Sequence, residues 1–142
     1  MSIDRRGSGI LLHPSSLPGD FGIGEIGQTA LDFIDQLEAM GQQYWQLLPL
    51  NPIGPCASPY SSSSSQACND LLVSVERLVE DGLLEDADIE ELRNMPHEHV
   101  DYSWVCHVKP RVLDKAADRF IERARPAEIA AFEAFCDEHG PV

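Results

Sequence analysis

Basic side chains are scarce in this sequence, and their scarcity limits the partners that the protein can bind. Lysine and arginine together number 10 against 24 aspartate and glutamate residues, which gives a net charge of −14 at pH 7. A chain this acidic repels the phosphate backbone of nucleic acids, so we expect no nucleic-acid partner. Long hydrophobic runs are also missing, because no apolar segment approaches the roughly 20 residues that span a membrane. We therefore expect a globular protein without a membrane partner.

The cysteines and the N-terminus restrict the compartment. The N-terminal residues include an arginine pair but no apolar segment long enough for export. No C-x-x-C pair occurs among the four cysteines, which are Cys56, Cys68, Cys106 and Cys136. The sequence therefore predicts reduced thiols and a cytoplasmic location.

The pattern in the first half of the chain predicts an α/β fold. An apolar run at residues 8–13 is typical of a strand buried on both faces. Apolar side chains between Ile26 and Leu37 share one face of a helix, which Gly41 is placed to end. A second strand is predicted over residues 44–50. Strand, helix and strand make a β–α–β unit, whose two strands should be parallel.

Loop and helix patterns fill the rest of the chain. Residues 51–70 contain three prolines and five consecutive serines, which predicts a long loop over a site. A short strand is predicted at 71–75, and a helical turn at 76–84 that ends at Gly82. The acidic cluster between 85 and 91 should begin a helix and face solvent. The helices expected beyond residue 84 are a short one in 86–95, a second over 112–124 and a third from Pro126 onward.

One glycine motif has two interpretations. Residues 22–27 read Gly-Ile-Gly-Glu-Ile-Gly and match the G-x-G-x-x-G pattern of dinucleotide-binding folds. The preceding strand ends near His13 with two prolines in between, so the tight strand-to-helix turn of those folds is missing. We favour a loop that needs positive φ at glycine, and we expect no cofactor.

A histidine-rich segment raises the question of a metal site. His97, Glu98 and His99 are followed by Cys106 and His107. This spacing is not a standard zinc pattern. We therefore expect solvated histidines and no metal.

The best candidate for a binding residue is a tyrosine in the long loop. Ser58, Pro59 and Tyr60 follow the second predicted strand, and loops at that end of parallel strands build active sites in α/β barrels. The tyrosine offers a flat apolar face and a hydroxyl group, which suits stacking on a sugar ring. The alternative is a tyrosine packed under its own loop.

Several segments taken together resemble a known family. RRGSGILLHPSSLPGDFGIGEIG, GQQYWQLLPLNPIG, SPY and NDLLVSVERLVEDGLL closely resemble the start of the 4-α-glucanotransferases, the amylomaltases or disproportionating enzymes. The similarity covers residues 5–84 strongly and 100–116 more weakly. Four positions depart from the family pattern, which usually has glutamine at Ser61, phenylalanine at Gln66, glycine at Cys68 and proline at Asp70.

The resemblance implies a fold, an activity and site residues. Family members are (β/α)8 barrels with helical insertions that transfer α-1,4-glucan segments between maltodextrins with retention. A complete barrel of this type needs about 200 residues or more, and this chain has 142. We therefore expect an incomplete barrel, with its first strands and helices in residues 1–84 and a helical insertion in 85–142.

The same resemblance implies a glucan site without the catalytic groups. Ser58 and Tyr60 would line the site, Trp45 and Asn69 would support it, and His13 is a weaker candidate. The family's catalytic carboxylates come from later strands, and no segment here matches them, so no catalytic residue is assigned. The chain alone should be inactive, with the missing C-terminal barrel portion as its partner. The alternative is a non-catalytic glucan-binding remnant.

Overall fold

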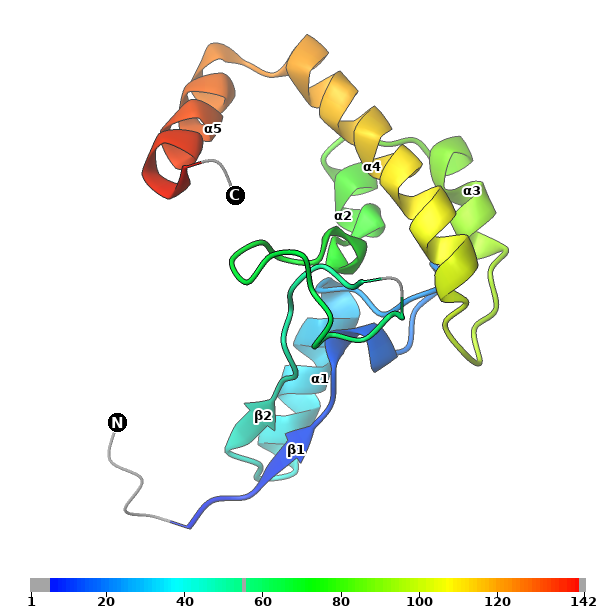
Figure 1. Ribbon diagram of the computed structural model, residues 1–142, viewed down its shortest axis with the longest axis vertical. Helices are drawn as coiled ribbons and strands as arrows, with labels where there is room; N and C mark the ends of the chain where they lie inside the picture. The colour runs from blue at the N-terminus through cyan, green and yellow to red at the C-terminus, as the bar shows by residue number, and fades with distance from the viewer. Residues whose placement is uncertain (1–5, 55, 141–142) are drawn as a thin grey trace.

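The protein contains a small parallel sheet and a larger group of helices. The computed structural model describes residues 6–54 and 56–140. Strand β1 (Gly9–Leu11) pairs in parallel with β2 (Tyr44–Gln46), with Ile10 opposite Trp45. Helix α1 (Gln28–Ala39) connects them and lies alongside the sheet (Figure 1). The predicted parallel β–α–β unit is confirmed, although each strand is only three residues long.

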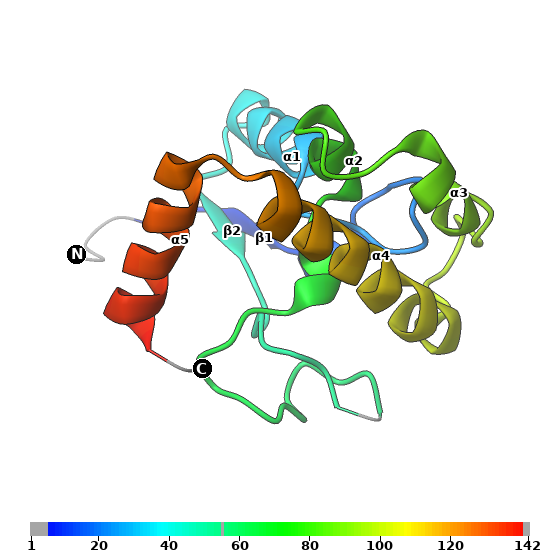
Figure 2. The same cartoon turned by 90° about the horizontal axis from the view of Figure 1, so that it is seen from above.

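Helices make up the second half of the chain. They are α2 (Val75–Glu80), α3 (Asp86–Arg93), α4 (Tyr102–Arg123) and α5 (Pro126–His139), and short 3-10 helices occur at η1 (Pro14–Ser16) and η2 (Asp70–Leu72). Figure 2 shows α2 and α3 beside α4, with α5 turned away from them. None of the helices in the described part of the chain is long and apolar enough to cross a membrane.

Local signals explain most of the helix boundaries. Gly41 and Gly82 have positive φ angles just beyond α1 and α2, as the sequence predicted. Pro126 occupies the first turn of α5, which also confirms the prediction. Helix α4 begins ten residues earlier than predicted, because the Asp101 carboxylate caps it by accepting a bond from the Trp104 amide. The helix continues through Pro110.

One predicted strand is wrong. Residues 71–75 form the end of η2 and the start of α2 instead of a strand. The side chain of Asn69 accepts a bond from the Leu71 amide, and the Ser74 hydroxyl caps α2 by accepting from the Arg77 amide. These two caps favour helical turns over the extended structure that the apolar run indicated.

The hydrophobic core lies among the helices. It contains residues from both sides of position 84, the predicted boundary between the barrel part and the helical insertion. Val75 from α2 packs with Ile89 and Leu92 from α3 and with Val105 and Val108 from α4. The loop before α1 contributes to the same core, whose other members are Phe21, Ile23, Leu71, Leu84, Met95, Val112 and Ala116.

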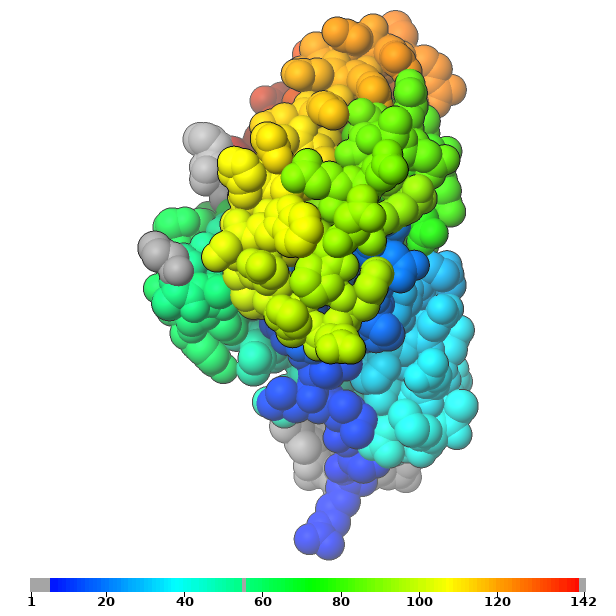
Figure 3. Space-filling view, turned by 90° about the vertical axis from the view of Figure 1, so that its right-hand side faces the viewer, coloured from blue at the N-terminus to red at the C-terminus, as the bar shows by residue number. Residues whose placement is uncertain are grey.

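The sheet and part of α1 are exposed instead. The strand predicted to be buried on both faces leaves Ile10 at 38% and Leu11 at 54% exposure. The predicted apolar face of α1 buries Ala30 and Leu37 but leaves Ile26 and Ile34 exposed. Figure 3 shows the described N-terminal residues, in blue, projecting from the end of the molecule, away from the packed helices. The prediction of a buried first strand fails because no described element covers this side of the sheet.

Candidate functional site

The carboxyl ends of the two strands lie at one edge of the sheet, and a histidine joins the loops that follow them. The His13 ring contacts the Ser15 hydroxyl through Nδ1 at 2.7 Å and the Pro49 carbonyl through Nε2 at 3.3 Å. The Ser15 amide also donates to Nδ1, at 3.2 Å. This set of bonds fits a neutral ring whose proton is on Nε2, with Nδ1 as the acceptor. His13 therefore holds the loops after β1 and β2 together.

A tryptophan from β2 supports the same edge. The Trp45 indole donates to the Leu12 carbonyl at 2.8 Å, and its ring packs edge-to-face on Phe33 of α1 with centroids 5.0 Å apart. Both contacts lie within the strand–helix framework. They fit the supporting role expected for Trp45.

The described residues of segment 51–69 form a closed loop beyond β2. Its two ends meet where the Asn69 amide donates to the Leu50 carbonyl at 2.7 Å. The Asn51 side chain crosses the loop and donates to the Ser64 carbonyl at 3.0 Å. The Ser64 hydroxyl in turn accepts from the Ala67 amide. These bonds give the serine-rich segment a folded shape that a flexible linker does not have.

The loop presents its tyrosine to solvent. The Ser61 amide donates to the Ser58 carbonyl at 3.1 Å, and the Tyr60 amide contacts the Ser58 hydroxyl at 3.3 Å. This turn leaves Tyr60 73% exposed. The alternative of a tyrosine packed under its own loop does not hold in this structure, and the ring is accessible to a ligand.

Cys56 lies in the same turn region. Hydrogen bonds from the Ser58 backbone and from the Ser61 side chain hold the pKa of its thiol below the ordinary value. Nearby Ala57 has a φ of 54°, in the left-handed region that alanine adopts at a cost of about 1–2 kcal/mol. The loop is therefore strained just before its tyrosine.

The departures from the family pattern at the loop's end are accommodated. Cys68 is exposed and has no positive φ, since Ala57 is the one non-glycine residue with positive φ in residues 6–54 and 56–140. Cysteine in place of glycine therefore adds no strain at that position. Asp70 begins η2, and the Asn69 cap holds that turn. The supporting role expected for Asn69 matches this contact.

The glycine motif serves packing within the chain. Gly22 has a φ of 75°, as expected for a loop that needs positive φ. A Cβ on Gly24 would overlap the Pro14 carbonyl, and one on Gly27 would lie 2.6 Å from the Ser74 hydroxyl. Each glycine is therefore accounted for by its own chain geometry.

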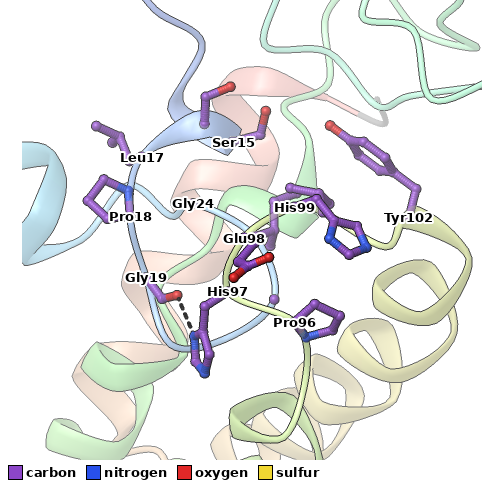
Figure 4. A pocket seen from close by; sticks show the side chains of 14 residues that line it. Ser15, Leu17, Pro18, Gly19, Gly24, Pro96, His97, Glu98, His99 and Tyr102 are labelled. Atoms are coloured by element: carbon purple, nitrogen blue, oxygen red, sulfur yellow. Dashed lines mark hydrogen bonds between the residues drawn. The ribbon is translucent and has the colours of Figure 1, made fainter.

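A groove of about 540 Å³ lies beside the glycine-containing loop before α1, between residues 15–24 and 96–102. Figure 4 shows Glu98, His99 and Tyr102 on one side of it and Leu17 on the other. His97 contacts the Gly19 carbonyl at 3.4 Å and the Asp20 carboxylate at 3.7 Å. Within the described residues, no group of three or more His, Cys, Asp or Glu side chains is arranged to hold a metal ion.

The sequence interpretation missed a buried ion pair next to the motif. Lys109 from α4 lies 2.5 Å from Glu25, and both side chains are buried. Burial raises the pKa of Glu25 and lowers that of Lys109, because desolvation penalises both charges, and their mutual attraction offsets part of this effect. A signal was present: Lys109 lies on the apolar stripe that also holds Val105, Val108 and Val112.

Parallel strands whose following loops gather at one sheet edge are the arrangement that α/β barrel enzymes use for their sites. Residues 12–142 match the family described as 4-alpha-glucanotransferase. The chain belongs to the 4-alpha-glucanotransferase family, as the resemblance indicated.

Individual relatives support this assignment. The chain is 43% identical over 122 residues to the chloroplastic/amyloplastic 4-alpha-glucanotransferase of Solanum tuberosum, an alignment covering 83% of this chain and 21% of that protein. It is 41% identical over 134 residues to 4-alpha-glucanotransferase of Synechocystis sp., with coverages of 94% and 26%.

A solved structure supports the fold. The amylomaltase from Streptococcus agalactiae in complex with acarbose superposes with a TM-score of 0.86 at 35% identity, covering 94% of this chain and 27% of that one. The chain therefore has the fold of one part of amylomaltase. It spans about a quarter of the length of the curated relatives it matches.

Proposed function

We propose that this chain is the N-terminal part of a 4-α-glucanotransferase that transfers α-1,4-glucan segments between maltodextrins with retention. The observation that carries the proposal is the 51–69 loop, which is closed at its base beyond β2 and presents an exposed tyrosine. Its place at the carboxyl edge of parallel strands is where barrel enzymes bind substrate. The family relationship supplies the chemical class of the substrate.

In this proposal Tyr60 stacks on a glucose ring and Ser58 lies beside it as a polar contact. An exposed aromatic face with a hydroxyl group at one end suits the alternating apolar and polar surfaces of a sugar. The related amylomaltase of known structure is itself a complex with acarbose.

The proposal assigns no catalytic residue to this chain. Retaining transfer needs a nucleophilic carboxylate and an acid/base carboxyl group about 5–5.5 Å apart. The 51–69 loop contains no aspartate or glutamate. In the loop before α1, Glu25 is paired with Lys109 while Asp20 is exposed beside His97. These two carboxylates face different partners and do not form such a pair.

The proposal extends to architecture and location. Residues 1–84 form the first strands and helices of a (β/α)8 barrel, and 85–142 belong to a helical insertion. The exposed side of β1 and β2 then contacts further barrel strands. The four unpaired, exposed cysteines favour a reducing compartment such as the cytoplasm.

The test is an activity assay of the 142-residue chain with maltotriose, alone and with a fragment supplying the remaining barrel strands of a relative. We expect no longer maltodextrins from the chain alone, and turnover once the fragment is added. Turnover by the chain alone would contradict the assignment of no catalytic residue. Glucan binding with no turnover in the mixture would favour the non-catalytic remnant.

Substitution of Tyr60 tests the binding site within that mixture. Tyr60→Ala should weaken transition-state binding by about 1–3 kcal/mol, which would be measured as a lower kcat/KM. Tyr60→Phe is the matched control, because it keeps the ring face and should keep most of the activity. Equal activity of Tyr60→Ala and the unchanged chain would show that Tyr60 is not a substrate contact.

A further inference from the structure

The ion pair of Glu25 and Lys109 is buried, and burying two charges is costly. Lys109 has 0% exposure, and its ammonium group lies 2.5 Å from Glu25 Oε1 and 2.7 Å from the Leu71 carbonyl. Removing two charges from water costs several kcal/mol per ion, which attraction repays only where geometry and further hydrogen bonds are good. An apolar pair would fill this position without that cost. The pair therefore calls for an explanation beyond packing.

Its hydrogen bonds converge on one short segment, residues 69–75. Lys109 binds the Leu71 carbonyl, and Glu25 Oε2 accepts from the Val75 amide at 3.1 Å. Between these two contacts, the Ile26 amide donates to the Leu72 carbonyl at 2.8 Å. The loop before α1 and helix α4 thus hold successive backbone groups of residues 71–75.

Residues 69–75 form the C-terminal end of the 51–69 loop and the turns that follow it, which together are called the base of the loop. Residue 69 closes the loop, because its amide donates to the Leu50 carbonyl at the end of the β2 strand region. The position of the loop relative to the strand edge therefore depends on where residues 69–75 are held. Lys109 lies 84 residues after Glu25 in the sequence, and its contact with Glu25 connects helix α4 to that segment.

We propose that Glu25 and Lys109 are a positioning pair that fixes the base of the 51–69 loop, and so the place of Tyr60, against the carboxyl edge of the strands. The role for Tyr60 rests on the function proposed above. The anchoring of the loop by the pair does not, because it concerns contacts within this chain.

Native-state hydrogen exchange of the full 142-residue chain distinguishes positioning from a general contribution to stability. Lys109→Met leaves the Glu25 charge unpaired and frees the Leu71 carbonyl. We expect protection of the Asn69, Leu71 and Val75 amides to fall at least tenfold more than protection of α3 amides. The Ser58 and Tyr60 amide resonances should shift at the same time.

A matched control separates loop anchoring from loss of overall stability. Leu92→Ala removes a side chain of α3 from the core that also contains Leu71 and Val75, but it leaves the hydrogen bonds of residues 69–75 to Glu25 and Lys109 in place. It should lower protection of α3 and of residues 69–75 together and leave the loop resonances in place. Equal effects of Lys109→Met at both sites, with unchanged loop resonances, would overturn the proposal.

A second variant covers the case in which Lys109→Met does not fold. Glu25→Gln combined with Lys109→Met leaves no unpaired buried charge. It should fold with the same selective loss at residues 69–75. Failure of both variants to fold would also overturn the proposal, because a pair on which the whole fold depends has no particular role at the loop.

Maltoheptaose binding then separates this inference from the proposed function. Selective loss of protection supports the positioning role whether or not the chain binds maltoheptaose. Absence of binding by the unchanged chain and by the mixture with the barrel fragment would count against the glucan site alone.

Discussion

The apolar residues of the two halves of this molecule differ in how far they are buried. In the helical half, Ile89, Leu92 and Val105 are almost inaccessible to solvent. In the β–α–β half, Leu11 and Ile34 keep about half of their surface exposed, at 54% and 47%. Both sets fit regular apolar patterns in the sequence. Periodicity therefore indicates which face of an element is apolar, and another element must be present before that face is buried.

The helical half is well packed because several of its helices are close in sequence and because the loop before α1 adds Phe21 and Ile23 to the same core. Helices α2, α3 and α4 follow one another and pack around Val75 and Met95. The sheet has two strands, and a two-stranded sheet is marginal on its own. Under the function proposed here, the partners of β1 and β2 are further barrel strands.

Paired substitutions in the two halves give the largest expected contrast. Leu92→Ala should lower the free energy of unfolding by about 2–5 kcal/mol, because it leaves a cavity in the core. Ile34→Ala, on the exposed face of α1, should cost about 0.5 kcal/mol or less. Urea unfolding followed by circular dichroism measures both values, and equal losses would contradict the division into a packed and an open half.

Glycine substitutions sharpen the contrast between a crowded and an open turn. Gly22→Ala should cost about 1–3 kcal/mol, because its φ of 75° disfavours alanine and the new Cβ would lie 2.9 Å from that of Met95. Gly82→Ala is the control, since its φ is 73° and nothing lies within 4 Å of the added carbon. The difference in unfolding free energy between the two variants measures the crowding at Met95. A larger loss for Gly82→Ala would contradict this account.

Hydrogen exchange compares the two halves without any substitution. Amides of the β1–β2 sheet should exchange at least tenfold faster than those of residues 105–112, a difference of about 1.4 kcal/mol in opening free energy. The reason is that the sheet has few covering side chains, whereas α4 is packed against α3 and η2. Strong and equal protection in both regions would indicate an independent domain with a complete core. Adding the barrel fragment should raise protection of the sheet.

The smallest expected effect concerns a charge at the edge of the helical half. Asp88 accepts hydrogen bonds from Arg119 at 2.5 Å and Lys115 at 3.2 Å, and chiefly the Arg119 bond lowers its pKa to about 2. A lowered carboxyl pKa stabilises the fold above the unfolded value of 3.8, and this contribution is lost as the pH falls toward 2.

Asp88→Asn should therefore destabilise the chain by about 1 kcal/mol at pH 7 and have little effect near pH 2. Thermal unfolding of both chains at the two pH values measures the change. Asp118→Asn, at an exposed position on α4, serves as the control. A pH-independent difference between Asp88→Asn and the unchanged chain would show that the ion pairs do not account for its effect.

The sequence by itself determined the β–α–β unit, the turns at Gly41 and Gly82, the start of α5 at Pro126 and the family. These features depend on local backbone preferences, on periodicity within one element, or on motifs whose order is specific. The exposed tyrosine of the 51–69 loop was also identified as a candidate from its place after β2, although its role in binding remains a prediction.

Only the tertiary structure decided the rest. It left β1 exposed, whereas the helical turns at residues 71–75 follow from the local caps at Asn69 and Ser74, which the sequence already contains. The tertiary structure also brought Lys109 to Glu25 across 84 residues of sequence, into a contact that no local pattern contains. The physical reason is the same for the exposure of β1 and for the Lys109–Glu25 contact: burial and long-range hydrogen bonds depend on which distant segments meet, whereas propensity and periodicity describe one segment at a time.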